Sequence, residues 1–148
     1  MIRKKDLYNE VSPLMEITEV RVRFNETDAL GIVWHGNYLT YFEDGREAFG
    51  RKYNIGYLDA IDNGYVTPIV SSNCSHKLTV KYGDVLRIET SYINTQAAKI
   101  IFRFKIYNQH DEIVCTGETV QVFLDKEGNL SLQLPVFYEE WKRTVGLL

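Results

Sequence analysis

Residues 25–53 read NETDALGIVWHGNYLTYFEDGREAFGRKY and join a polar loop to an amphipathic helix. Glycines and Asx residues are concentrated between Asn25 and Asn37, a composition typical of a shaped loop. From about His35 to Tyr53, apolar residues recur at spacings of three and four, which predicts one long helix. The stripe consists of Tyr38, Tyr41, Phe42, Gly45, Ala48 and Phe49, while Glu43, Asp44, Arg46 and Glu47 fall mostly outside it. Gly45 costs such a helix about 1 kcal/mol relative to alanine, so a close approach of another element would explain it.

Strands are predicted on both sides of this helix. Glu16 to Glu26 alternates, with Val20, Val22 and Phe24 on one face. The later predicted strands cover residues 67–82, 85–94, 97–108, 113–124 and 130–134, with a short helix at 57–62 and a closing helix from Pro135 through Lys142. Short turns join most of these strands and therefore force antiparallel pairing. We expect an α+β fold in which one antiparallel sheet curls around a single long helix.

The 148 residues fit a single domain over 1–148, with an N-terminal arm at 1–15, a core at 16–134, and a C-terminal helix and tail at 135–148. Hydrophobic residues make up 45% and charged residues 25%, and the formal net charge of -3 argues against nucleic acid as a partner. Two cysteines without a C-x-x-C spacing favour a reducing compartment. The sequence shows no signal peptide and no membrane span of roughly 20 apolar residues, so we expect a cytoplasmic protein without a membrane partner.

Asp28 is the first candidate for chemistry, and its position allows two interpretations. Its carboxylate can support the turn by accepting backbone hydrogen bonds. Alternatively, an ionised carboxylate near the start of the long helix can attack a carbonyl or take a proton from water. The backbone amide of His35 is the second candidate, because amides at a helix start lack acceptors and carry the positive end of the dipole. Gly36 beside it would let a ligand approach the backbone.

Other chemistries lack their motifs. No two histidines stand at a metal-binding spacing, which argues against a zinc site. The serines at 71, 72 and 75 lack a G-x-S-x-G elbow. Neither G-x-G-x-x-G nor a P-loop is present, so no nucleotide cofactor is expected, and we predict a protein without metal or cofactor.

The stretch Thr27–Tyr38, TDALGIVWHGNY, resembles the signature of the hotdog-fold acyl-CoA thioesterases. It is most similar to the 4-hydroxybenzoyl-CoA thioesterase branch, whose pattern is D-x-x-G-I-V-(W/Y)-(H/Y)-x-x-Y. Residues 67–71, 84–86 and 88–90 also match that branch, and the resemblance spans about 18–125. Within the signature, the positions expected to contact substrate are Gly31, Val33, Gly36 and Tyr38.

The resemblance implies a curled sheet around one helix and a homo-oligomer, dimer or tetramer, with active sites at the subunit interface. It also implies that the partner molecule is an acyl-CoA. The family's essential aspartate falls on Asp28, as nucleophile through a mixed anhydride or as general base. The family's carbonyl-polarising amide falls on His35, where the hydroxybenzoyl enzyme has a phenol side chain. This departure leaves the acyl group open, aromatic or aliphatic.

Alternative functions remain at this point. The chain could act on acyl groups attached to acyl carrier protein, or it could bind acyl-CoA without turnover. A dehydratase fits the loop-borne Asp28 less well. For the nucleotide end of CoA, Lys77, Lys81 and Arg87 are candidate contacts.

Overall fold

Alternating apolar side chains build the middle of the sheet. In strand β4, Lys99–Tyr107, the side chains of Ile100, Phe102, Phe104 and Ile106 are buried, whereas Arg103 and Lys105 are exposed. This period of two gives the strand one core face and one polar face. The computed structural model describes residues 9–148, so the predicted arm at 1–8 lies outside the described residues.

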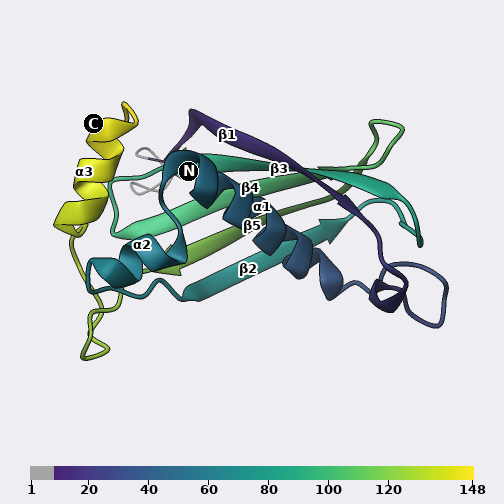
Figure 1. Cartoon of the computed structure of the whole chain (residues 1–148), viewed down its shortest axis with the longest axis horizontal. Helices are drawn as coiled ribbons and strands as arrows, with labels where there is room; N and C mark the ends of the chain where they lie inside the picture. Colours follow the sequence, from purple (N-terminus) through teal and green to yellow (C-terminus); the bar gives the residue numbers. More distant parts are fainter. Residues whose placement is uncertain (1–8) are drawn as a thin grey trace, which may run out of the picture.

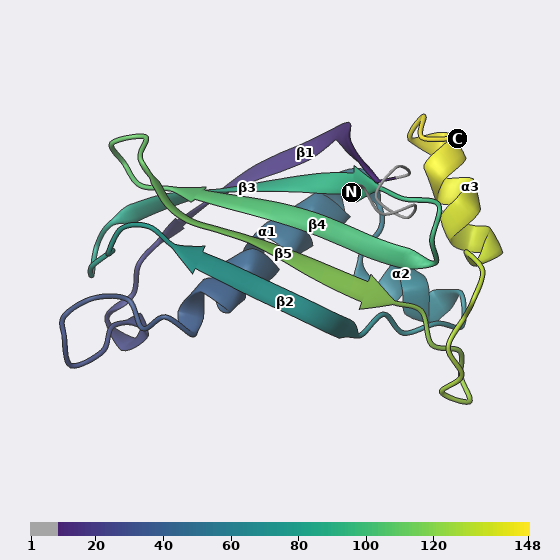
Figure 2. The same ribbon diagram turned by 180° about the vertical axis from the view of Figure 1, so that it is seen from behind.

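Five strands form one antiparallel sheet with the order β1-β3-β4-β5-β2. The other strands are β1 (Glu10–Arg21), β2 (Ile69–His76), β3 (Val85–Asn94) and β5 (Ile113–Val122). Figure 1 shows helix α1 (Asn37–Tyr53) lying across one face of this sheet. Figure 2 shows the opposite face, which no helix from the described part of the chain covers. The predicted α+β arrangement is therefore confirmed.

Helix α1 packs directly on the middle strands. Phe42 stacks on Phe104 with ring centroids 4.4 Å apart, and Phe49 is fully buried against the sheet. A Cβ at Gly45 would overlap the Thr90 hydroxyl and the Ile88 side chain on β3. The close approach that would explain a glycine in this helix is therefore present, and it fixes how deeply α1 sits on the sheet.

Two short helices lie at the end of the sheet opposite the loop that precedes α1 (Figure 1). They are α2 (Tyr57–Asp62), with the predicted bounds, and α3 (Val136–Thr144), which follows Pro135 as expected and extends two residues beyond Lys142. Polar contacts fasten α3, because the Tyr138 hydroxyl donates to the Tyr92 hydroxyl and the Trp141 indole donates to the Tyr53 carbonyl. The long helix, predicted from about His35, begins at Asn37 and ends at Tyr53 as expected.

Several predicted boundaries are wrong. Strand β1 begins at Glu10, so residues 10–15 belong to the sheet rather than to an arm; a register shift between Val11 and Met15 disturbs the alternation there. The same strand ends at Arg21, and residues 24–26 form a 3-10 helix, η2 (Phe24–Glu26). The Phe24 side chain, expected on the buried face, is 76% exposed and meets only the edge of the Tyr82 ring.

Three further predictions also fail. Strand β2 covers Ile69–His76 instead of residues 67–82. The amides of Lys77 and Leu78 both bond to the Val114 carbonyl, which ends the regular ladder with β5, and the Val80 carbonyl then accepts the amide of Val33 in the loop. Residues 130–134 do not form a strand; Leu130 makes only an isolated bridge with Leu124. Arg46, expected off the buried stripe of α1, is only 6% exposed.

Candidate active site

Glu26 organises the loop between β1 and α1. Its carboxylate accepts hydrogen bonds from the Arg23 amide at 2.7 Å, the Arg23 guanidinium at 3.0 Å and the Tyr41 hydroxyl at 3.1 Å. Its backbone carbonyl accepts from the Trp34 amide and from the Asn37 side chain. The start of α1 is thus tied to the end of β1, and the residues between them have little freedom.

Asp28 occupies a tight turn inside this loop. Its carboxylate Oδ1 accepts the Leu30 amide at 2.8 Å, and its backbone carbonyl accepts the Gly31 amide. Gly31 has φ +78°, which a glycine adopts without strain. The bond from Leu30 is the turn-supporting interaction considered for this residue. It uses one carboxylate oxygen, and the half-buried side chain keeps the other available for chemistry.

The amides of His35 and Gly36 precede the first residue of α1. Neither donates a hydrogen bond to another residue within 9–148. The next amides are already satisfied, because Asn37 donates to the Trp34 carbonyl and Tyr38 donates to the His35 carbonyl. Two free donors at the positive end of a helix form an arrangement that can stabilise negative charge on a carbonyl oxygen.

A surface pocket is lined by the first of these two residues, His35. Its lining includes Val33, His35 and Tyr38 from the loop and helix start, and His76, Lys77 and Leu78 from the end of β2 and beyond. The His76 ring lies 6.4 Å from the His35 ring and 5.1 Å from the Tyr38 ring, measured between centroids. Burial raises the pKa of Tyr38 to about 12, so its phenol stays protonated and can only donate or accept a hydrogen bond at neutral pH. We call this space the site pocket.

The predicted site residues fall into two groups. Val33, His35 and Tyr38 share the site pocket, whereas Asp28 and Gly31 lie in the adjoining turn and do not line it. Gly36 differs from expectation, because the Trp34 indole occupies the space where its Cβ would stand. Position 36 therefore needs a glycine because the Trp34 side chain packs there, and not because a ligand does.

Sequence reasoning missed His76 as a site residue. The histidine spacing gives this residue no predicted role, yet its ring faces His35 and Tyr38 across the site pocket. The sequence does not predict that residues 76 and 35 are close in space. Their proximity depends on tertiary structure, in which β2 pairs with β5 and its end lies near the start of α1. Within residues 9–148, no three His, Cys, Asp or Glu side chains are grouped to hold a metal ion, and no helix there is long and apolar enough to cross a membrane.

Comparison with solved structures defines the class of fold. The dihydroxynaphthoyl-CoA (DHNA-CoA) thioesterase of Staphylococcus aureus superposes with a TM-score of 0.79 over 90% of this chain and 92% of its own, at 25% identity. The 4-hydroxybenzoyl-CoA thioesterase of a Pseudomonas species superposes with a TM-score of 0.73 over 86% of this chain and 98% of its own, at 27% identity. The curled sheet around α1 is therefore a hotdog fold.

Sequence comparison then identifies the family. Residues 22–142 match the model of the thioesterase-like superfamily. The Bacillus subtilis protein YneP, whose name assigns it provisionally to the acyl-CoA thioesterases, is 31% identical over 83% of this chain and 89% of its own length. The chain belongs to the thioesterase-like superfamily of hotdog proteins, and several of its named relatives are thioester hydrolases.

Proposed function

We propose that this chain hydrolyses acyl-CoA thioesters to a free acid and CoA. The observation that carries the proposal is the His35 amide, which stands at the start of α1 beside a pocket open to solvent. Like the neighbouring Gly36 amide, it donates no hydrogen bond within residues 9–148. A thioester carbonyl docked there would receive one or two hydrogen bonds that strengthen as its oxygen becomes negative. The family membership and the names of the relatives support the same chemistry.

Asp28 supplies the second half of the proposed reaction. In one route its carboxylate attacks the carbonyl carbon, the CoA thiolate leaves, and water hydrolyses the resulting mixed anhydride. In the other route the carboxylate removes a proton from a water molecule that attacks the carbonyl directly. The His35 amide polarises the carbonyl in both routes. Val33 and Tyr38 would bound the acyl group in the site pocket, and Gly31 would shape the turn that carries Asp28.

We also propose that the protein works as a homo-oligomer. Every residue of β2 except Cys74 is exposed in the single chain, including Ile69 and Val70. This strand lies at the edge of the sheet, next to the site pocket that His76 lines. A second copy seated along β2 would cover these apolar side chains and add a wall to the pocket, which in one chain is shallow and does not include Asp28.

The variant Asp28→Asn tests the proposed function. Asparagine keeps an oxygen for the Leu30 amide and favours the same turn, so the loop should persist while the charge is lost. We expect kcat/KM for acyl-CoA substrates, followed by trapping the released thiol, to fall about 100- to 10,000-fold. Asp125→Asn is the matched control, because Asp125 also accepts backbone amides in an exposed turn. That turn follows β5, and Figure 1 shows the segment after β5 at the opposite end of the sheet from the loop before α1.

The outcomes separate the alternatives. Wild-type turnover by Asp28→Asn would remove the proposed role of this carboxylate. A wild-type protein that binds acyl-CoA without releasing thiol would favour a non-catalytic module. Faster release from acyl groups loaded on acyl carrier protein would favour the carrier-protein thioesterase, and cell fractionation would check the cytoplasmic location expected from the sequence.

A further inference from the structure

One face of α1 leads away from the site pocket toward the other end of the molecule. Tyr38 lines the site pocket. Further along the helix, Leu39, Phe42, Glu43 and Arg46 share one face, because they are three or four residues apart. The last four line a second depression, bounded on its far side by Ile69 and Ser72 of β2. We call this depression the α1–β2 groove. The groove and the site pocket share no lining residue, but both lie between α1 and the β2 side of the sheet, and the groove extends along α1 from Leu39 to Arg46.

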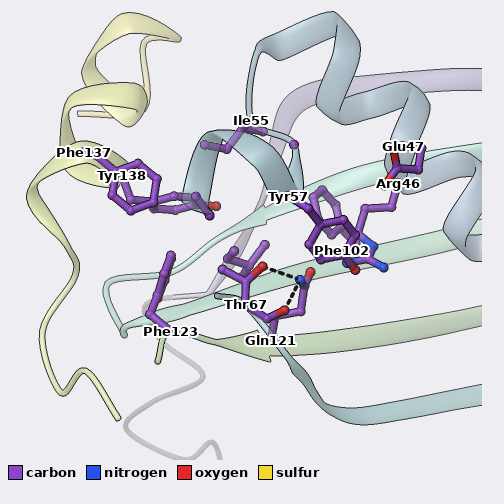
Figure 3. A pocket seen from close by; sticks show the side chains of 13 residues that line it. Arg46, Glu47, Ile55, Tyr57, Thr67, Phe102, Gln121, Phe123, Phe137 and Tyr138 are labelled. Atoms are coloured by element: carbon purple, nitrogen blue, oxygen red, sulfur yellow. Dashed lines mark hydrogen bonds between the residues drawn. The ribbon is translucent and has the colours of Figure 1, made fainter. Parts of the chain in front are cut away.

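Arg46 also lines a third cavity, the distal cavity, which Figure 3 shows from close by. The volume open to the centre of a water-sized sphere is about 30 Å³, enough for a small terminal group, and the walls are mainly aromatic and aliphatic. Phe102 comes from β4, Phe123 directly follows β5, and Phe137 comes from α3. In this mainly apolar setting the cavity is also lined by the polar residues Arg46, Glu47, Thr67 and Gln121 (Figure 3). Of these four, Arg46 and Gln121 have buried polar atoms without a hydrogen-bond partner among the described residues.

The orientation of the Gln121 amide follows from its neighbours. Gln121 is 2% exposed, and its Nε2 donates to the Thr67 carbonyl at 2.7 Å and to the Thr67 hydroxyl at 3.3 Å. A backbone carbonyl can only accept, so the nitrogen must lie on that side. The acceptor Oε1 is consequently on the other side, and it receives no hydrogen bond within the described residues.

Gln121 has an acceptor without a donor, whereas Arg46 has donors without an acceptor among the described residues. Its guanidinium lies over the Tyr57 ring, 4.4 Å from the centroid, and burial lowers its pKa to about 10, which still leaves it protonated at neutral pH. Glu43 contacts Nη2 from one turn earlier, but neither Nη1 nor Nη2 makes a hydrogen bond of normal geometry in the described part of the chain. Buried donors and acceptors without partners are costly, so a ligand that satisfies both is favoured here.

Resting on the proposed thioesterase function, we propose that the preferred acyl group is a long chain that lies in the α1–β2 groove and places a terminal hydroxyl between Arg46 and Gln121. A hydroxyl accepts from Arg46 and donates to Gln121 Oε1 at once. A terminal carboxylate cannot donate to Gln121, and a methyl group can do neither. From Gly36 to Arg46 the helix rises about 15 Å, at about 1.5 Å per residue. An extended chain of roughly a dozen carbons, with C–C bonds of about 1.5 Å, spans that length.

The test compares two substrates on the wild-type full chain: dodecanoyl-CoA and 12-hydroxydodecanoyl-CoA. We expect kcat/KM for the hydroxylated substrate to be at least about tenfold higher, because a site built around a hydroxyl discriminates against an analogue that lacks it. Equal values, a preference for the plain chain, or turnover of short acyl-CoAs alone would overturn this inference while leaving the thioesterase function standing. Failure to hydrolyse any acyl-CoA would overturn the proposed function and this inference with it.

Variants test whether Arg46 and Gln121 cause the expected preference for the hydroxylated substrate. Arg46→Met and Gln121→Leu should each bring the ratio of the two kcat/KM values close to one, and Arg46→Lys should retain part of it. Arg103→Met is the matched control, because Arg103 is exposed on β4, pairs with Glu118, and lines none of the three spaces. It should keep the wild-type ratio. Thermal unfolding checks that each variant is folded, and a folded Arg46 or Gln121 variant with an unchanged ratio would refute the assignment.

Discussion

Glu26 shows how one buried carboxylate can hold a functional loop. Burial alone would raise the pKa of Glu26, but hydrogen bonds from the Arg23 amide, the Arg23 side chain and the Tyr41 hydroxyl outweigh it and lower that pKa. The carboxylate is therefore more acidic in the folded chain than in the unfolded chain, where the pKa of a glutamate is about 4.3. Its ionisation stabilises the folded state above that value, and this contribution is lost as the pH falls through the folded pKa.

We predict that Glu26→Gln lowers the free energy of unfolding by about 1–3 kcal/mol at pH 7, because charge-assisted hydrogen bonds become neutral ones. The difference from wild type should shrink as the pH falls below about 4. Urea unfolding at several pH values measures it, and Glu127→Gln, in an exposed turn, serves as the control. A loss of equal size at pH 3 and pH 7 would contradict the assignment to the charge.

Individual site residues differ in how far the sequence could predict them. The turn at Asp28 and the free amide at His35 follow from local features, namely Asx and glycine spacing and the start of a helix. Arg46 and Gln121 could not be predicted in this way. A charged residue off the apolar stripe is normally solvated, and only the packing of α2 beside α1 places the Tyr57 ring under Arg46.

At the scale of the element, Gly45 sets the distance between α1 and the sheet. Gly45→Ala would improve the intrinsic helix propensity by about 1 kcal/mol. The new methyl group would nevertheless meet Thr90 and Ile88, so we predict a net loss of about 1–3 kcal/mol. Guanidinium unfolding measures the change, with Arg51→Ala on the exposed side of α1 as the control. A stabilised Gly45→Ala protein would show that the helix can lift from β3 at little cost.

Element boundaries were predictable where the local pattern and the tertiary pairing agree. Val85–Asn94 and Tyr57–Asp62 have the predicted bounds, since alternation or helical spacing coincides with a turn at each end. Predicted and observed boundaries differ where tertiary contacts determine the end of an element. Residues 77–82 have a strand-like composition, yet the Val80 carbonyl bonds to Val33 of the loop instead of continuing the β2–β5 ladder. At 10–15 the irregular pairing with β3 conceals the strand.

At the scale of the whole molecule, the two edges of the sheet are protected differently. The β1 edge carries several charged side chains, has an irregular register, and is contacted by Lys52 and Tyr53 at the Met15 backbone. Strand β2, with the sequence IVSSNCSH, contains no Lys, Arg, Asp or Glu and lies open along its length. Natural sheets use charge and irregularity to prevent edge pairing, so β2 is the edge suited to a second copy. The curled sheet itself was predictable, because one apolar helix needs one sheet to cover it.

Val70→Lys tests this assembly, because a charge at an exposed apolar position of β2 should oppose edge-to-edge contact. We expect wild-type protein to show at least twice the chain mass of 17.2 kDa by light scattering, and the variant to shift toward a single chain. Thioesterase activity should fall together with the mass, since the site pocket would lose the wall supplied by the partner. Val11→Lys places the same charge on the exposed, irregular β1 edge and should leave both mass and activity unchanged. If Val70→Lys becomes monomeric yet keeps full activity, the site is complete within one chain; if wild type is already monomeric, the apolar surface of β2 serves another purpose.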